Sequence, residues 1–478
     1  MKRNKLTAIL LLIAALTSCG GSTTDEVTTP PATEPTETTA PETDYTETLT
    51  ANRYDGMTLN LLGTYHASRQ TFAEESENGE PVNDALFRRD REIEELFGIT
   101  VRTNLSDSID SDATKSAMSG DDEYQLVLGT MGGVQKNLAL KRLSSNLHDF
   151  PYISLDKPWW CAQADENLTV NGKLFFTTGP ITPQFYFAAQ AMAYNTRLAE
   201  EYSITDLDTL ALEGKWTLDK LEELLKYKGK DLNGDGKMNG DDSFGMVFES
   251  SVGANAFYVG AGEKYCEVGN GGITVSIADE KSVGLIERLS KLLTDQENVY
   301  DTHLAPEDIN HFVKMFTDGR SLFATTSMSH VIVSFREMTD DYVLLPMPKL
   351  DESQEDYHTY SNQWCLGGVS IPVTVKEREA VGNILETMAY LSWKYVRPAQ
   401  YEITLKGKVA RESESQSKLL DIIFDSSYYD LNGIFNFGKS ADLVGKAITG
   451  QTNTLASDYE SIKNSVKNDI DSLMENFE

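Results

Sequence analysis

The sequence predicts an α/β fold in which parallel strands alternate with helices. Residues 57–63 form an apolar stretch with the character of a strand, and a helical pattern follows in which Leu86 and Phe97 lie on one face. Gly98 ends this helix, and residues 99–101 begin a second strand. The order strand, helix, strand is that of a β-α-β unit, and such units build doubly wound sheets.

A third strand is expected at residues 124–129, after a short helix. In doubly wound sheets, ligands bind beyond the carboxyl ends of the strands. Residues 64–66 and 130–132 follow two of these ends and are therefore expected at the mouth of a site. The alternative is that these residues only turn the chain.

The second half of the predicted fold begins with strand patterns at residues 172–176 and 189–194, followed by a helix at 195–202. Another helix begins after Thr217, whose hydroxyl suits an N-cap, and Trp216 occupies the staple position before it. We expect Trp216 to be a structural residue rather than a ligand contact.

The N-terminus has the parts of a bacterial lipoprotein signal. Basic residues precede an apolar run at 6–16, which is too short to span a bilayer, and residues 16–19 resemble the lipobox. We therefore predict a signal peptide at 1–18, lipidation of Cys19, and a disordered linker of Thr, Pro and Glu at 19–52. The alternative is an ordinary secreted protein with a chance cysteine.

Composition excludes several classes of protein. The chain has 478 residues, with 42 Lys and Arg against 74 Asp and Glu, so its net charge of −32 repels nucleic acid. The six His show no spacing typical of a zinc site. Cys161, Cys266 and Cys365 are odd in number and lack a CxxC spacing, so we expect buried thiols rather than a disulfide scaffold.

Residues 231–242 have the spacing of a twelve-residue calcium loop. Gly236 supplies the turn at position 6, and Asp242 replaces the usual Glu at position 12, which should weaken the site. Filled at extracellular calcium concentrations, the site would stabilise the protein locally. The alternative is a solvated acidic turn. The expected Ca²⁺ ligands are Asp231, Asn233, Asp235, Lys237 through its carbonyl, Asn239 and Asp242.

The sequence contains no recognisable catalytic motif. The nucleophile elbow, the P-loop, the HExxH zinc motif and the dinucleotide-binding glycine pattern are all missing from it. Acidic residues are so numerous that sequence alone cannot single out a glycosidase pair. We therefore expect a protein that is not an enzyme.

Five segments, taken in order, resemble the bacterial extracellular solute-binding proteins of carbohydrate ABC transporters, family 1, the class that includes maltose-binding protein. These segments are residues 156–160, 166–174, 214–218, 316–323 and 345–349. The resemblance covers about residues 57 to 440. It implies a type II periplasmic-binding-protein fold, in which two α/β lobes are joined by hinge crossovers and close on a solute.

Carried onto this chain, the resemblance implies that lobe 1 comprises residues 53–177 and 350–400, and that lobe 2 comprises 178–349 and 401–478. It also implies a monomer that is lipid-anchored to the outer face of the cell membrane and delivers a carbohydrate, expected to be an oligosaccharide, to ABC permease subunits. The alternative is a surface-anchored lipoprotein that binds or degrades polysaccharides.

The same resemblance indicates which residues should line a cleft between the lobes. Sugars present apolar C–H faces and hydroxyl groups, so aromatic and planar polar side chains are expected there. Maltose-binding relatives have a Trp near the position of Met328, which argues against a simple maltodextrin as the solute. The expected ligand contacts are Tyr65, Met131, Gln184, Tyr186, Tyr258, Met328 and Trp364.

Overall fold

The chain divides into two units, residues 1–48 and 49–478, and every element described below belongs to the second. The signal peptide, Cys19, most of the linker and Tyr65 lie outside the described residues. The computed structural model describes residues 45, 49–50, 52–64, 76–182, 184–226, 228–269, 272–302, 308, 310–401, 413–452 and 454–477.

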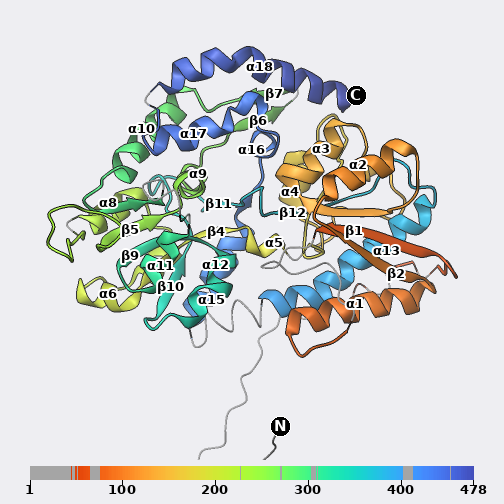
Figure 1. Ribbon diagram of the computed structural model, residues 1–478, viewed down its shortest axis with the longest axis horizontal. Helices are drawn as coiled ribbons and strands as arrows, with labels where there is room; N and C mark the ends of the chain where they lie inside the picture. The colour runs from red at the N-terminus through yellow and green to blue at the C-terminus, as the bar shows by residue number, and fades with distance from the viewer. Residues whose placement is uncertain are drawn as a thin grey trace, which may run out of the picture. The chain divides into compact units, whose positions relative to one another are not determined.

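The first sheet has four strands in the order β12-β3-β1-β2 (Figure 1). Strands β1, β2 and β3 are parallel, and β12 runs antiparallel to β3. This arrangement confirms the β-α-β expectation, and Gly98 ends the first helix in a left-handed conformation with φ 69°. The strands are β1 (Thr58–Thr64), β2 (Thr100–Ser106), β3 (Leu126–Thr130) and β12 (Gly367–Ser370).

Helices cover both faces of this sheet (Figure 1). On one face, Leu62 and Val127 of the sheet pack with Ile109 and Leu138, which come from the helices that follow β2 and β3. The helices are α1 (Pro81–Phe97) and α13 (Arg378–Leu391) on one face, and α2 (Ile109–Ser119) and α3 (Lys136–Leu140) on the other.

The second sheet has five strands in the order β10-β4-β9-β5-β8. Strand β5 is parallel to both β8 and β9, whereas β4 is antiparallel to β9 and β10. The strand expected at residues 189–194 is therefore confirmed. The strands are β4 (Gln190–Asn195), β5 (Phe244–Phe248), β8 (Val299–Asp301), β9 (Ser321–Ser327) and β10 (Tyr342–Leu345).

Two buried clusters sandwich the five-stranded sheet. In the first, Trp216 is fully buried, its indole N–H donates to the Pro346 carbonyl, and the Thr217 hydroxyl caps the next helix as expected. The first cluster involves α7 (Leu207–Leu212), α8 (Leu218–Leu225), α9 (Ser250–Gly260), α10 (Glu280–Leu293) and α17 (Ala441–Ile448); the second involves α5 (Gln184–Phe187), α11 (His311–Thr317), α12 (Met328–Val333) and α15 (Glu414–Asp425).

Two sequence expectations need correction. Residues 172–176 do not form a strand, because the Leu174 N–H donates to the Asn146 side chain and pairing nearby is limited to isolated bridges. The helix expected at 195–202 is shorter and spans Thr196–Glu201 as α6, with Asn195 as its N-cap.

Several segments connect the two sheets. Thr177 forms an isolated bridge with Val369 of β12, and β11 (Thr359–Tyr360) pairs in parallel with β13 (Ser427–Tyr428). The long helix α18 (Leu455–Asn476) begins at Leu455, which joins the first buried cluster. Phe477, beyond the end of this helix, packs against Phe175, with ring centroids 4.4 Å apart. The strands of the first sheet come from residues 58–130 and 367–370. The lobe boundaries that the resemblance implies stay a prediction.

No helix in the described ranges is long and apolar enough to cross a membrane. Cys161, Cys266 and Cys365 form no disulfide with one another; Cys266 is buried and the other two are half-buried.

Candidate functional site

The two sheets turn the carboxyl ends of several parallel strands toward the segments that connect them. Strand β3 ends at Thr130 and runs into a short π-helix, η2 (Met131–Gln135), which continues directly into α3. In the second sheet, β5 ends at Phe248 and is followed by Glu249, the N-cap residue of α9. Strand ends of this kind are where α/β sheets bind ligands.

A connecting loop lies directly on the end of β3. The Met131 N–H donates to the Leu366 carbonyl and the Gly132 N–H to the Gln363 carbonyl, each over 3.0 Å. A Cβ at position 132 would stand only 2.8 Å from Cγ of Gln363, so this approach requires glycine. These contacts hold the loop that carries Trp364 in a defined position.

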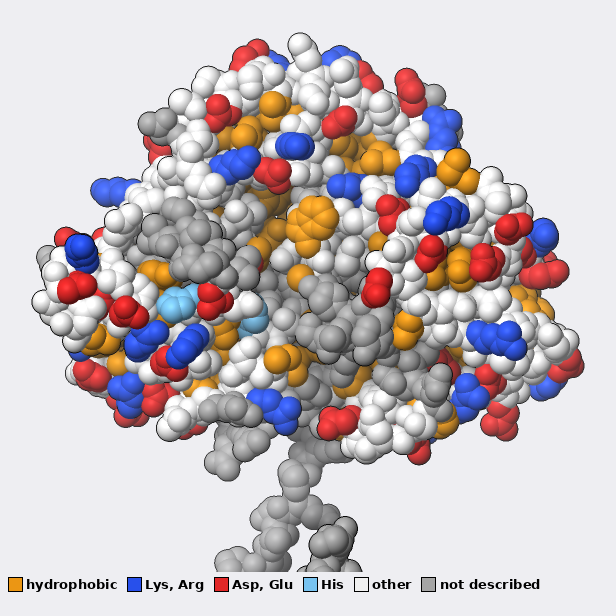
Figure 2. All heavy atoms as spheres, viewed as in Figure 1, with side chains coloured by type: hydrophobic (Ala, Val, Ile, Leu, Met, Phe, Trp, Pro, Cys, Tyr) orange, Lys and Arg blue, Asp and Glu red, His pale blue; other side chains and the backbone are white. Residues whose placement is uncertain are grey.

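Trp364 is the largest aromatic side chain that this loop exposes. It is 57% exposed, and the Lys136 ammonium lies 5.7 Å from the centroid of its ring. Figure 2 shows hydrophobic side chains exposed near the centre of this face of the protein, with basic and acidic side chains beside them. An exposed indole face beside a cation offers a surface on which a sugar ring can stack.

Gln363, next to this indole in the chain, is held by a buried tyrosine. The Tyr360 hydroxyl donates to Oε1 of Gln363 over 2.7 Å, which leaves the amide N–H groups of Gln363 available to a ligand. Burial raises the pKa of Tyr360, and the charge of Glu249 raises it further, so this carboxylate lies within electrostatic reach of the hydroxyl. We call Lys136, Glu249, Gln363 and Trp364 the strand-end site.

The charged groups of the strand-end site are partly withdrawn from water. Burial raises the pKa of Glu249 to about 7. Burial also lowers the pKa of Lys136, while the nearby charge of Asp442 raises it. An aromatic face, amide donors, an ammonium and a carboxylate together suit the recognition of a polyhydroxylated molecule.

The predicted ligand contacts are only partly brought together. Trp364 belongs to the strand-end site, and Met131 adjoins it through its backbone, although the Met131 side chain is fully buried. Gln184 is 4% exposed, and its Oε1 would lie 2.9 Å from a Cβ at Gly367. Tyr65 lies outside the described residues.

Three predicted contacts belong to the protein core. Tyr258 is fully buried, and its hydroxyl is within hydrogen-bonding distance of the Ser282 hydroxyl and donates to the Lys264 carbonyl. Tyr186 packs against Phe185, Tyr401 and Phe424, and Met328 is fully buried in the same cluster. All three side chains belong to the buried clusters on the two faces of the five-stranded sheet, which corrects the expectation that they face a ligand.

Sequence reasoning missed Lys136, Glu249 and Gln363. The position of Glu249 could have been predicted from the sequence. Glu249 directly follows the strand pattern at 244–248 and therefore stands at the carboxyl end of a strand, where ligands bind. The sequence held no comparable indication for Lys136 and Gln363, because their positions depend on contacts between segments more than 200 residues apart in the chain.

In the predicted calcium loop, residues 231–237 and 241 are exposed, 238–240 are half-buried, and Asp242 is fully buried. Its carboxylates cap the backbone of the loop: Asp231 accepts from the N–H groups of Gly234 and Gly236, and Asp242 accepts from those of Leu232 and Asn239. Among the described residues, no three His, Cys, Asp or Glu side chains converge into a metal-binding group. The oxygen donors suit Ca²⁺ in type, and a bound ion would need them to turn inward from the backbone.

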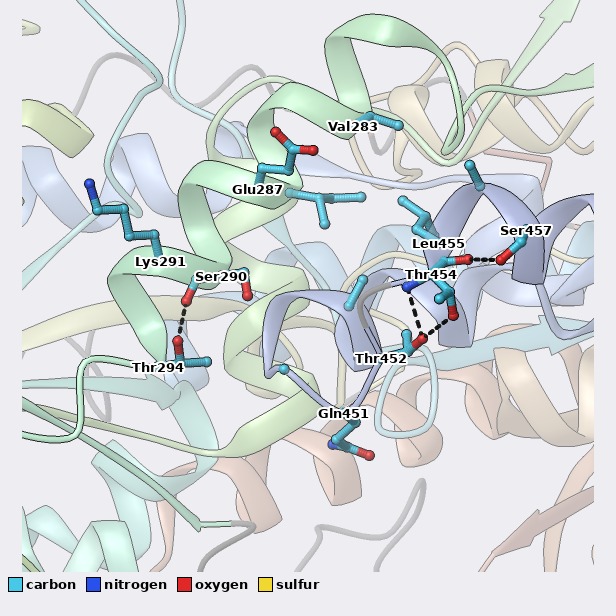
Figure 3. A pocket seen from close by; sticks show the side chains of 14 residues that line it. Val283, Glu287, Ser290, Lys291, Thr294, Gln451, Thr452, Thr454, Leu455 and Ser457 are labelled. Atoms are coloured by element: carbon cyan, nitrogen blue, oxygen red, sulfur yellow. Dashed lines mark hydrogen bonds between the residues drawn. The ribbon is translucent and has the colours of Figure 1, made fainter.

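A separate groove of about 910 Å³ lies between α10, α17 and the start of α18. Figure 3 shows Glu287 and Lys291 on α10 and, on the other side of this groove, Thr452, Thr454 and Ser457; the Lys291 side chain points away from these three residues. The hydroxyl groups of Thr452 and Thr454 are within hydrogen-bonding distance of each other, and that of Ser457 donates to the Thr454 carbonyl. Glu287 is exposed and lies apart from the strand-end site, so it provides a matched carboxylate for control experiments.

The structure defines a class of fold: two α/β sheets with connecting crossovers, as in the periplasmic binding proteins, which confirms the fold that the resemblance implies. No protein-family model and no curated protein matches the sequence.

Three solved structures share this fold. The maltose/maltodextrin-binding domain MalE from Bdellovibrio bacteriovorus, bound to maltotriose, has a TM-score of 0.53 and 16% identity, and the match covers 87% of this chain and 100% of that one. The maltose-binding protein MalE from Listeria monocytogenes, in complex with maltose, has a TM-score of 0.57 and 12% identity, covering 87% and 98%. A substrate-binding protein of an ABC transporter from Listeria monocytogenes, in complex with cycloalternan, has a TM-score of 0.54 and 13% identity, covering 88% and 99%.

Proposed function

We propose that this protein is the extracytoplasmic solute-binding component of an ABC importer and that it captures a carbohydrate, an oligosaccharide, at the strand-end site. The observation that carries the proposal is Trp364, an indole held exposed by backbone hydrogen bonds where the two sheets meet. Three solved structures with the same fold hold maltotriose, maltose and cycloalternan, which supports a sugar as the solute.

The protein acts by differential affinity and has no turnover. The sugar ring stacks on Trp364, the amide of Gln363 donates to hydroxyl oxygens, and Glu249 accepts from hydroxyl groups. A solute that contacts both sheets stabilises the conformation in which they are closest together, and permease subunits recognise that conformation. A polysaccharide-degrading enzyme with the same anchor is the alternative, and it would release cleaved product.

The predicted lipid anchor completes the proposal. Cys19 would carry the lipid, and the linker of Thr, Pro and Glu would let the binding unit reach a permease from the outer face of the membrane. We also propose that the loop at 231–242 binds Ca²⁺. Its oxygen-bearing side chains at positions 1, 3, 5, 9 and 12 support this proposal, and the ion would relieve repulsion among Asp231, Asp235 and Asp242.

A melting-temperature screen against mono- and oligosaccharides tests the binding function. A sugar at 100 times its Kd should stabilise the protein by about 2.7 kcal/mol. X-ray scattering should then show a smaller radius of gyration with the best sugar, and chromatography should recover that sugar intact. Cleaved sugar would favour the enzyme, and a broad screen without any stabilising carbohydrate would contradict the proposal.

A further inference from the structure

The last helix, α18, links the helices on the five-stranded sheet to those on the four-stranded sheet. It begins at Leu455 in the first buried cluster, contacts α17, and reaches α3 at its other end (Figure 1). Its 22 residues span about 33 Å. One stiff element therefore touches the helices that pack on both sheets.

Little of α18 is buried between its two ends. Near its middle, Val466 packs against the short 3-10 helix η8 (Phe437–Lys439), where the Gly438 N–H donates to the Asp469 carboxylate over 2.7 Å. Most of the other side chains of α18 are exposed. Within the helix, the buried residues are Leu455, Val466 and Leu473. The helix is thus held at its start, its middle and its end rather than along a continuous face.

Hydrogen bonds in both directions fix the far end of α18 on the end of α3. Nε of Arg142 donates to Oδ1 of Asn476 over 2.6 Å, and Nη2 of Arg142 donates to the Glu475 carbonyl over 2.9 Å. In return, the Asn476 amide donates to the Leu140 carbonyl over 2.8 Å. Because the guanidinium is planar, its two bonds orient the end of α18 as well as holding it.

An aromatic contact adds to these hydrogen bonds. Phe477 follows α18, is 1% exposed, and meets Phe175 edge-on. Phe175 lies two residues before Thr177, which forms a bridge with Val369 of β12, so this contact reaches the four-stranded sheet itself. The C-terminal latch, as we call this set, consists of Arg142, Phe175, Asn476 and Phe477.

The backbone of Arg142 is unusual for a residue that carries a side chain. Arg142 follows α3 in the left-handed region, with φ 57°, and its N–H donates to the Ala139 carbonyl. Glycine is the common residue at such helix ends, and other residues adopt this conformation only at a cost. The bonds from the Arg142 side chain to α18 offset that cost, so an arginine here serves the contact with α18 rather than the end of α3.

We infer that the C-terminal latch restrains the movement of the two sheets relative to each other. Its contacts are made in the arrangement of this structure and are lost when the end of α18 leaves α3, so they favour this arrangement over others. Because α18 is stiff and is fixed beside the five-stranded sheet, a displacement of one sheet must carry the other or break the latch. The inference goes beyond the proposed function, since it requires no particular solute.

Pulsed electron paramagnetic resonance on the full mature chain without solute tests this inference. Spin labels on non-natural amino acids at Lys115 on α2 and Lys291 on α10, both exposed, report the distance between helices of the two sheets and leave the native cysteines unlabelled. Arg142→Gly removes the guanidinium and suits the left-handed backbone, so α3 should stay folded. We expect Arg142→Gly and Phe477→Ala each to give a broader distance distribution than the wild type.

Ser203→Gly is the matched control for Arg142→Gly. Ser203 follows α6 with the same φ of 57°, is exposed, and its side chain forms no hydrogen bond with any described residue. This control should keep the wild-type distribution. Wild-type distributions in both Arg142→Gly and Phe477→Ala, with both proteins folded by their melting curves, would overturn the inference, and so would an equally broad distribution in Ser203→Gly. Because no sugar is present, neither result bears on the proposed function.

Discussion

Replacing Trp364 and Tyr258 in turn separates binding from folding. Trp364 is 57% exposed, so Trp364→Ala removes less buried surface than a core substitution and should lower the free energy of unfolding by only about 1 to 2 kcal/mol. Tyr258 is fully buried and hydrogen-bonded, so Tyr258→Ala should lower that free energy by roughly 3 to 5 kcal/mol. Tyr258→Phe keeps the ring and should cost only about 1 to 2 kcal/mol.

The effects on sugar affinity should run the other way. Loss of a central stacking surface costs roughly 1 to 3 kcal/mol of binding free energy, so Trp364→Ala should raise Kd about 5- to 150-fold. Tyr258→Phe, which stays well folded, should bind with a wild-type Kd. Urea unfolding and calorimetric titration with the best neutral oligosaccharide measure the two quantities. A Trp364→Ala protein with unchanged Kd, or a Tyr258→Phe protein that is stable but weakly binding, would show that the site has been assigned to the wrong residues.

Three further predictions concern the anchor, the calcium loop and buried acids. Cys19→Ala should move the protein from the membrane fraction to the soluble fraction, and a variant that stays fully membrane-bound would contradict the lipid anchor. Ca²⁺ should raise the melting temperature of the wild type and of Asp241→Asn, at a loop position that supplies no ligand, but not of Asp235→Ala; a chelator without effect on the wild type would leave only an acidic turn. Burial raises the pKa of Asp165 and of Glu386 to about 7, so the stability they contribute is present at low pH and is lost as pH rises through 7. Urea unfolding at pH 5 and pH 8 should therefore show greater stability at pH 5, by up to roughly 3 kcal/mol for each group, and greater stability at pH 8 would contradict this sign.

Local features of the chain were predictable because their causes lie within a few residues. Gly98 ends its helix since only glycine adopts positive φ at low cost, and Thr217 caps a helix through a bond to an N–H three residues away. The strands at 57–63 and 189–194 followed from runs of apolar residues. The strand expected at 172–176 failed because hydrogen bonding from distant segments took its place.

The sequence by itself determined most of the elements and the α/β class, which depend on residue type and short spacing, and the calcium loop stays a prediction from the same kind of spacing. Only the tertiary structure decided which aromatic residues are exposed. From the sequence, Tyr258 and Trp364 were equally good candidates for sugar contacts. In the structure Tyr258 is fully buried, whereas Trp364 is 57% exposed. The difference arises because burial depends on packing between distant segments: the loop of Trp364 is held outward by Met131 and Gly132, more than 230 positions earlier in the chain.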